Sequence, residues 1–140
     1  KRQIVAGHIA PTYIMKVNDD IGYGLFAYRE LKTGEMVGKY AGALTRDWTS
    51  TIKKPKDFNP YLLKYPFDLP YAIDAKKVGN TMRFINHSSK NANIGRLCIW
   101  NNNILHVIFV VEKNIPRHAQ IFLDYGRNYW HTSIPKEIGP

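Results

Sequence analysis

Short runs of apolar residues, set apart by turn-forming residues, dominate the pattern along this chain. Gly, Pro, Asn and Asp recur between the runs, and this alternation favours short strands joined by turns. The pattern predicts strands at residues 13–17, 25–28, 36–40, 71–74, 96–100, 104–111 and 121–125. Residues 32–35 have turn composition, and residues 101–103 are three asparagines, which tolerate the left-handed backbone of a tight hairpin. We therefore expect a mostly β fold of several small sheets.

Helical spacing is scarce in the chain. Residues 47–52 suit a helical turn or two, and residues 77–85 have weak helical spacing with Gly79 inside it. Residues 53–70 carry four of the eight prolines among aromatic residues, so this segment cannot form a regular helix or a central strand. The segment is too apolar for a free linker, and we interpret it as an ordered surface insert. Without an internal repeat, the sequence predicts one domain over residues 1–140.

The composition is that of a folded domain. The chain has 140 residues, 44% of them hydrophobic and 13% aromatic, which excludes a disordered chain. Its one cysteine, Cys98, cannot form an internal disulfide, and cysteine clusters for zinc are absent, so we predict no metal site and a reducing compartment. The longest apolar stretch, residues 104–111, is interrupted by His106 and is too short to cross a bilayer. No charged-then-apolar leader is visible, so a soluble protein without a signal peptide is expected.

The strongly basic balance bears on partners. Lys and Arg number 20 against 11 acidic residues, a net charge of +9, and a field of this sign attracts polyanions. The basic residues are spread along the chain, so a merely solvated basic surface is the alternative. Motifs that read bases, such as zinc fingers or RNP aromatics, are absent. A nucleic-acid-binding β-domain therefore has no support beyond charge.

The polar motifs are weak when each is taken alone. Residues 22–24, Gly-Tyr-Gly, lack the third glycine and the helix of a dinucleotide fold, and a plain turn explains them. His87 has no second histidine at zinc spacing, and a hydrogen-bonded structural histidine is the simpler interpretation. Asp124 and Tyr125 are equally consistent with the end of a strand, and no nucleophile elbow surrounds Ser88.

The order of these motifs carries more information than any one of them. The sequence resembles the SET domain of protein lysine methyltransferases over about residues 13–130. The resemblance rests on residues 22–27 (Gly-Tyr-Gly-Leu-Phe-Ala), 34–35 (Gly-Glu), 40–42 (Tyr-Ala-Gly), 71–75 (Tyr-Ala-Ile-Asp-Ala), 79–80 (Gly-Asn), 83–88 (Arg-Phe-Ile-Asn-His-Ser) and 124–126 (Asp-Tyr-Gly). It implies a SET fold of several small sheets with a knot-like C-terminal threading and little helix. It also implies methyl transfer from S-adenosylmethionine to a lysine in a protein.

Two segments depart from the family pattern. Residues 89–93 lack the usual proline after Asn-His-Ser, and residues 118–121 read His-Ala-Gln-Ile where Gly-Glu-Glu-Leu is usual. Both changes put local loop geometry in doubt. The zinc-binding cysteines that flank many members are also missing, so the chain resembles the minimal bacterial or viral form, whose C-terminal residues must close the active site without metal.

The resemblance assigns roles to individual residues. Tyr125 matches the catalytic tyrosine; a phenol with a pKa of ~10 is a poor base at neutral pH, so orientation and electrostatic stabilisation are its expected roles. The residues matched to cofactor binding are Gly22, Tyr23, Gly24, Arg83, Asn86, His87 and Trp130. The residues matched to the channel for the substrate lysine are Tyr40, Leu123 and Tyr129. Structural pairing is the alternative for Arg83, and ordinary packing is the alternative for Trp130 and Tyr129.

Leu123 bears on how many methyl groups are added. Members that stop at one methyl often have a tyrosine two residues before the catalytic tyrosine, where its hydroxyl holds a water that blocks rotation of the amine. Leu123 offers no hydroxyl there, so the resemblance implies di- or trimethylation.

The partners and location expected from the resemblance follow the same family. The substrate would be a basic protein or peptide, with a histone tail expected, and the basic surface would contact nucleosomal DNA; no membrane partner is expected. The location would be nuclear chromatin, or host chromatin for a secreted effector of a microbe. The alternative function is a catalytically silent SET fold that binds peptides.

Overall fold

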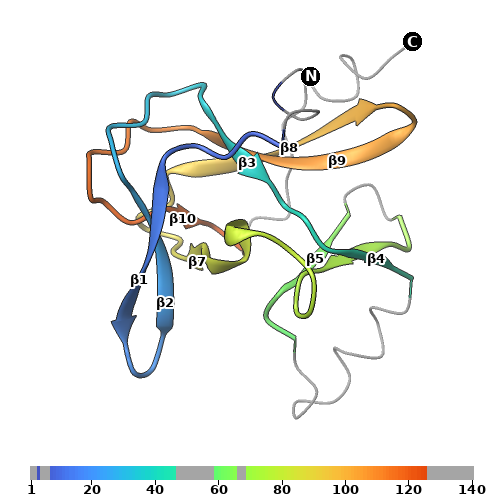
Figure 1. The fold of residues 1–140 in the computed structure, drawn as a ribbon, viewed down its shortest axis with the longest axis horizontal. Coiled ribbons are helices and arrows are strands. Elements are labelled where there is room, and N and C mark those ends of the chain that lie inside the picture. The colour runs from blue at the N-terminus through green and yellow to red at the C-terminus, as the bar shows by residue number, and fades with distance from the viewer. Residues whose placement is uncertain (1–2, 4–6, 47–58, 66–68, 126–140) are drawn as a thin grey trace. The chain divides into compact units, whose positions relative to one another are not determined.

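The computed structural model describes residues 3, 7–46, 59–65 and 69–125, and among these it is built mainly of strands (Figure 1). The chain contacts group into two compact units: residues 1–39 with 84–140 form the first unit, and residues 40–83 form the second. The first unit contains β1 (Thr12–Asn18), β2 (Gly22–Ala27), β3 (Met36–Lys39), β7 (Asn86–His87), β8 (Ile94–Asn101), β9 (Ile104–Val111) and β10 (Phe122–Leu123). The second contains β4 (Ala43–Thr45), β5 (Leu62–Lys64), β6 (Ala72–Asp74) and most of the 3₁₀ helix η2 (Thr81–Phe84).

The mostly β fold class with several small sheets is confirmed, and each predicted strand overlaps an observed one. The strands β4, β5 and β7 were not predicted, because two or three residues are too few to show alternation of apolar and polar positions. The helical spacing at residues 77–85 corresponds only to η2, and residues 47–52 lie outside the described residues. No helix among the described residues is long and apolar enough to span a membrane.

The largest sheet of the first unit has the order β3–β9–β8 and is antiparallel. The long hairpin β8–β9, drawn in yellow and orange in Figure 1, turns at Asn102 and Asn103, whose φ angles of 51° and 62° are those of the predicted tight turn. One face of the hairpin carries Ile94, Cys98, Val107, Phe109 and Val111, which are 2% exposed or less. These side chains form much of the core of the unit.

Residues 118–123 join the small strands of the first unit. The backbone of His118, Ala119 and Ile121 exchanges hydrogen bonds of 2.7–3.0 Å with β2, antiparallel to it. The chain then continues as β10, which pairs in parallel with β7. This segment therefore lies between the glycine-containing strand β2 and the Asn-His strand β7, although the three are far apart in sequence.

His118 stands where the resemblance expects a glycine, and its φ of 68° lies in the left-handed region that favours glycine. A left-handed backbone costs a residue with a side chain about 1–2 kcal/mol. His118 Nδ1 lies 3.0 Å from the hydroxyl of Tyr13, and the two rings contact edge to face with their centroids 5.9 Å apart. The loop therefore has the left-handed conformation that a glycine would adopt without strain, with a histidine whose side chain contacts Tyr13.

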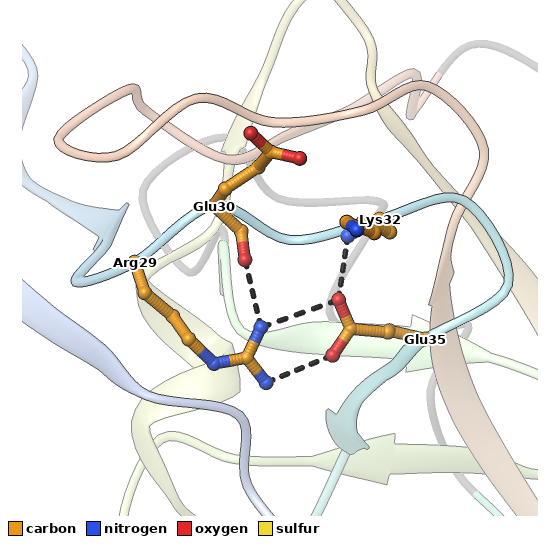
Figure 2. A network of polar contacts seen from close by, with 4 residues as sticks. All are labelled: Arg29, Glu30, Lys32 and Glu35. Carbon is orange, nitrogen blue, oxygen red and sulfur yellow. Dashed lines mark hydrogen bonds and ion pairs between the residues drawn. The ribbon is translucent and has the colours of Figure 1, made fainter.

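A polar network holds the predicted turn between β2 and β3 (Figure 2). The Glu35 carboxylate accepts hydrogen bonds from Arg29 Nη2 at 2.8 Å and from the backbone N–H of Lys32 at 2.5 Å. Arg29 Nη1 also donates to the carbonyl of Glu30 at 2.7 Å. The Arg29 side chain, and next the Lys32 backbone, lower the pKa of Glu35. At pH values above the ordinary pKa of a glutamate, the network therefore stabilises the turn. This stabilisation is lost as the pH falls through the lowered pKa of Glu35.

The second unit is a small antiparallel sheet with the order β4–β6–β5. Only part of the proline-rich insert 53–70 is described, and within it β5 is an edge strand, in keeping with the expectation that this segment forms no central strand. The Asn59 side chain, which is 7% exposed, donates to Asp74 Oδ1 at 2.8 Å. Gly42 is required for space, since a Cβ there would lie 2.5 Å from the carbonyl oxygen of Asp74.

Burial makes Cys98 a thiol that we predict to be unreactive in the folded protein. Its side chain is 0% exposed, and desolvation raises the pKa of the thiol to about 12. Because the thiolate is the reactive form, a disulfide reagent such as DTNB should label Cys98 at least ~100-fold more slowly in the native protein than in 6 M guanidinium at pH 8. Stopped-flow absorbance measures both rates. Equal rates would show that Cys98 is not in the core.

Candidate active site

The glycine motif lies on β2, where Gly24 is buried and the neighbouring Tyr23 side chain is 55% exposed. A Cβ at Gly24 would lie 2.6 Å from Gln120 Oε1 and 3.0 Å from Asn86 Nδ2. The missing side chain therefore lets two carboxamides approach the backbone of β2. Gly22 differs, because nothing lies within 4 Å of the place of its Cβ and its φ is 81°. Gly22 thus serves the turn that opens β2.

The carboxamide of Asn86 joins β7 to β2. Asn86 Nδ2 donates to the carbonyl of Tyr23 at 3.1 Å and to Gln120 Oε1 at 3.0 Å. An amide nitrogen has two hydrogens, so both are used by these acceptors. Among the described residues, no group donates a hydrogen bond to Asn86 Oδ1, so this oxygen can still accept one.

His87 lies beside Tyr125. His87 Nδ1 accepts the backbone N–H of Tyr125 at 2.9 Å, and the ring centroids are 5.4 Å apart with an interplanar angle of 42°. Nδ1 is also 3.9 Å from Asp124 Oδ1. The hydrogen bond from Tyr125 determines the tautomer of the imidazole. Because Nδ1 accepts this N–H, it carries no hydrogen to donate to Asp124. The proton of the neutral imidazole is therefore on Nε2.

Tyr125 has its hydroxyl held in place although the residue is 51% exposed. The hydroxyl donates to the backbone carbonyl of Ile85, the residue before β7. The hydroxyl hydrogen is therefore directed at a main-chain carbonyl, and this hydrogen bond orients the phenol of Tyr125.

Leu123 is 4% exposed on β10, where it pairs with His87 in the parallel register. It is one of the buried hydrophobic residues of the core. Asp124 follows it, with its carboxylate toward the His87 ring at the distance given above.

Two of the candidate residues lie in the second unit. The Tyr40 hydroxyl donates to the carbonyl of Tyr61 at 2.6 Å, and the Tyr40 side chain is 8% exposed. Arg83 Nη1 donates to the carbonyl of Ala75 at 3.1 Å, and its guanidinium lies 5.8 Å from the centroid of the Tyr61 ring. These contacts give Arg83 the structural pairing that the sequence left open as an alternative.

Trp130, Tyr129 and the expected C-terminal threading lie outside the described residues. Within the described part of the chain, no three His, Cys, Asp or Glu side chains group together in a way that would hold a metal ion.

Sequence reasoning missed Gln120 and Asn93. Asn93 Oδ1 accepts the backbone N–H of Phe122 at 2.9 Å, and its Nδ2 donates to the carbonyl of Gln120 at 3.0 Å. Asn93 therefore holds β10 in place through its side chain. The one available signal was positional: Asn93 ends the departing segment 89–93, and Gln120 stands in the departing segment 118–121.

The sequence of this chain is similar to those of known proteins. The SET domain family matches residues 22–126. The histone-lysine N-methyltransferase Su(var)3-9 of Drosophila melanogaster is 30% identical over 137 residues, which are 90% of this chain and 21% of that protein. The histone-lysine N-methyltransferase trithorax of Drosophila virilis is 30% identical over 126 residues, 84% of this chain and 3% of that protein.

Solved structures of the polycomb repressive complex 2 are similar in fold. The complex in its stimulated state matches with a TM-score of 0.76 and 26% identity, over 95% of this chain and 17% of the matched chain. A complex bound to S-adenosylmethionine in an autoinhibited conformation matches with a TM-score of 0.76 and 25% identity, over 95% of this chain and 17% of the other. The chain thus spans about a fifth or less of these proteins. Because the family match covers most of its length, this chain belongs to the SET domain family.

Proposed function

We propose that this chain transfers a methyl group from S-adenosylmethionine to the side-chain amine of a lysine in a protein. One observation carries the proposal: residues 118–125 place Tyr125 beside His87 and bring β7 to the glycine motif of β2, within a chain that belongs to the SET domain family. The similarity to named histone-lysine N-methyltransferases supports the same reaction class.

The hydrogen-bonding groups of the first unit suit the cofactor. S-adenosylmethionine carries an ammonium group and a carboxylate, so its site must offer both acceptors and donors. Asn86 Oδ1 is an acceptor for an ammonium, because both hydrogens on Nδ2 are used elsewhere. His87 offers Nε2–H as a donor, because Nδ1 accepts the Tyr125 N–H. Asn86, His87 and the backbone around Gly22, Tyr23 and Gly24 would hold the cofactor, with Trp130 and Arg83 as further candidates from the family pattern.

The chemistry explains why an oriented tyrosine is useful. The bound cofactor supplies an electrophilic methyl group on a sulfonium. The attacking amine must be neutral, and deprotonating a lysine with a pKa of ~10.4 at pH 7 costs about 4–5 kcal/mol. An apolar channel lowers this cost because desolvation disfavours the ammonium form. Tyr125, whose hydroxyl hydrogen is donated to Ile85, acts here by presenting its oxygen to the reacting groups rather than by removing a proton.

Tyr125→Phe should lower turnover at least about tenfold and leave cofactor affinity within about twofold, because the change removes one hydroxyl at the reacting centre. Peptide methylation and isothermal titration of S-adenosylmethionine measure the two quantities. Tyr28→Phe is the matched control, since Tyr28 is 57% exposed and packs against Arg117, outside the site. Near-normal turnover of Tyr125→Phe would remove the role given to Tyr125. Peptide binding without methylation by the unmodified chain would favour a silent SET fold.

Leu123 determines product number in this proposal. A second transfer requires the monomethylated amine to rotate, and an apolar wall accepts the first methyl group without leaving a polar atom unsatisfied. Tyr40 and Tyr129 also have hydroxyl groups. If either hydroxyl lined the channel, it would hold a water that blocks rotation of the amine. In this structure the Tyr40 hydroxyl donates to Tyr61.

The unmodified chain should produce di- or trimethyl-lysine in long reactions, and Leu123→Tyr should shift the products toward monomethyl-lysine. Mass spectrometry of a single-lysine peptide under excess cofactor reads the product ladder. Leu123 is buried, so Leu123→Phe is the matched control: it adds a similar ring without the hydroxyl. A ladder of the unmodified chain that ends at one methyl, or equal shifts in both variants, would contradict a hydroxyl-based limit.

A histone or histone-like tail is the proposed substrate, on nuclear chromatin, because the similar proteins are named histone-lysine N-methyltransferases. A chain of net charge +9 repels a lysine-rich tail unless its groove is locally acidic or a polyanion recruits it. Nucleosomal DNA meets this need, and Lys76 and Lys77 are exposed basic residues available to contact it. We therefore include contact with DNA through the basic surface in the proposal.

Methylation of nucleosomes should exceed methylation of the free tail, and it should fall at least about tenfold between 50 and 200 mM salt, because phosphate contacts release counterions. The free-tail reaction at the same salt concentrations is the control. The charge reversal of Lys76 and Lys77 to Glu should reduce the salt dependence on nucleosomes and leave the free-tail rate unchanged. A flat response to salt, with both substrates equally good, would contradict docking on DNA.

A further inference from the structure

Gln120 makes side-chain contacts that the family roles assigned above do not explain. It is half-buried and lies in the segment that runs antiparallel to β2, opposite Phe26. Its Oε1 accepts a hydrogen from Asn86 Nδ2 at 3.0 Å. The same oxygen lies 2.6 Å from the place where a Cβ of Gly24 would be. The carboxamide of Gln120 therefore occupies the space that Gly24 leaves open.

Two acceptors facing Nδ2 set the orientation of the Asn86 carboxamide. Asn86 Nδ2 faces two oxygens, the carbonyl of Tyr23 at 3.1 Å and Oε1 of Gln120. If the carboxamide rotated by half a turn, Oδ1 would face the carbonyl of Tyr23, which has no hydrogen to donate, whichever way the Gln120 carboxamide is turned. The carbonyl of Tyr23 alone would leave one amide hydrogen unsatisfied. Two acceptors commit both hydrogens and leave Oδ1 for a ligand.

We propose that Gln120 is a positioning residue that fixes the Asn86 carboxamide with its oxygen available to the cofactor ammonium. The proposal rests on the proposed function for the identity of the ligand. It gives a physical reason for an acceptor at position 120, where Gly-Glu-Glu-Leu is usual and this chain has Gln: a glutamine oxygen accepts the Asn86 hydrogen as a carboxylate would. Gln120 acts through Asn86 and touches no reacting atom in this assignment.

The main-chain atoms of Gln120 make structural contacts of their own, so a substitution at this position tests the side chain alone. Its carbonyl accepts from Asn93 Nδ2 at 3.0 Å, and the residue forms a β-bridge to Phe26. These contacts involve main-chain atoms of residue 120 and persist in Gln120→Ala. The variant therefore removes the hydrogen bond to Asn86 without removing the pairing of the segment with β2. Gln3→Ala, at the chain's other glutamine, which is exposed, is the matched control.

Isothermal titration of S-adenosylmethionine with the full chain tests the proposal. Gln120→Ala should weaken binding about fivefold, the effect of losing one hydrogen bond, and raise the cofactor KM equally without changing the peptide KM. Gln120→Glu keeps an acceptor and should restore binding to within about twofold. In an Asn86→Ala background, Gln120→Ala should have less than a twofold effect, because the residue it positions is gone. Gln120→Ala that binds as the unmodified chain does, or equal effects in both backgrounds, would overturn the proposal.

Nuclear magnetic resonance of the ligand-free protein separates this inference from the proposed function. The side-chain amide protons of Asn86 should change chemical shift and exchange faster with solvent in Gln120→Ala, and should be nearly unchanged in Gln120→Glu. Unchanged Asn86 amide signals in Gln120→Ala would overturn the positioning role. An unmodified chain that shows these signals but binds no S-adenosylmethionine would overturn the proposed function and leave the positioning of Asn86 standing.

Discussion

The main-chain pairing of residues 118–123 is the constraint on which the candidate site depends. One side of this segment exchanges hydrogen bonds with β2, and its continuation, β10, runs parallel to β7. Parallel neighbours cannot be joined by a short turn, so β7 and β10 come from distant parts of the sequence. The pairing brings the glycine motif, the Asn-His pair and Tyr125 into one unit.

Side-chain hydrogen bonds reinforce this backbone pairing. Asn93 binds β10 through both its side-chain oxygen and its side-chain nitrogen, and Gln120 lies against Gly24 and Asn86. The half-buried polar groups at this junction are therefore hydrogen-bonded to one another, which is how such groups are accommodated without a loss of stability. Among the described residues, Asn86 Oδ1 and His87 Nε2 are not used by this network.

Two replacements within the departing segment 118–121 have physical explanations in the structure. His118 takes the left-handed backbone of a usual glycine and gains a contact with Tyr13, a residue 105 positions away. Gln120 keeps an acceptor where the family usually has a carboxylate. Each replacement preserves a geometric requirement, a φ angle in one case and a hydrogen-bond acceptor in the other. Substitutions of this kind leave the fold unchanged while they alter charge and local contacts.

The sequence by itself determined the fold class and most strands, because runs of apolar residues and turn-forming residues act locally. It also determined the family, through the order of its motifs. It also indicated Asn86, His87 and Tyr125 through their order along the chain. Only the tertiary structure decided which atoms of these residues are engaged. The Asn86–Gln120 hydrogen bond joins residues 34 positions apart, and the hydroxyl of Tyr125 reaches a carbonyl 40 positions away. Hydrogen bonds between such distant residues leave no periodic pattern in a sequence, since they depend on strand pairing that forms only when the whole unit folds.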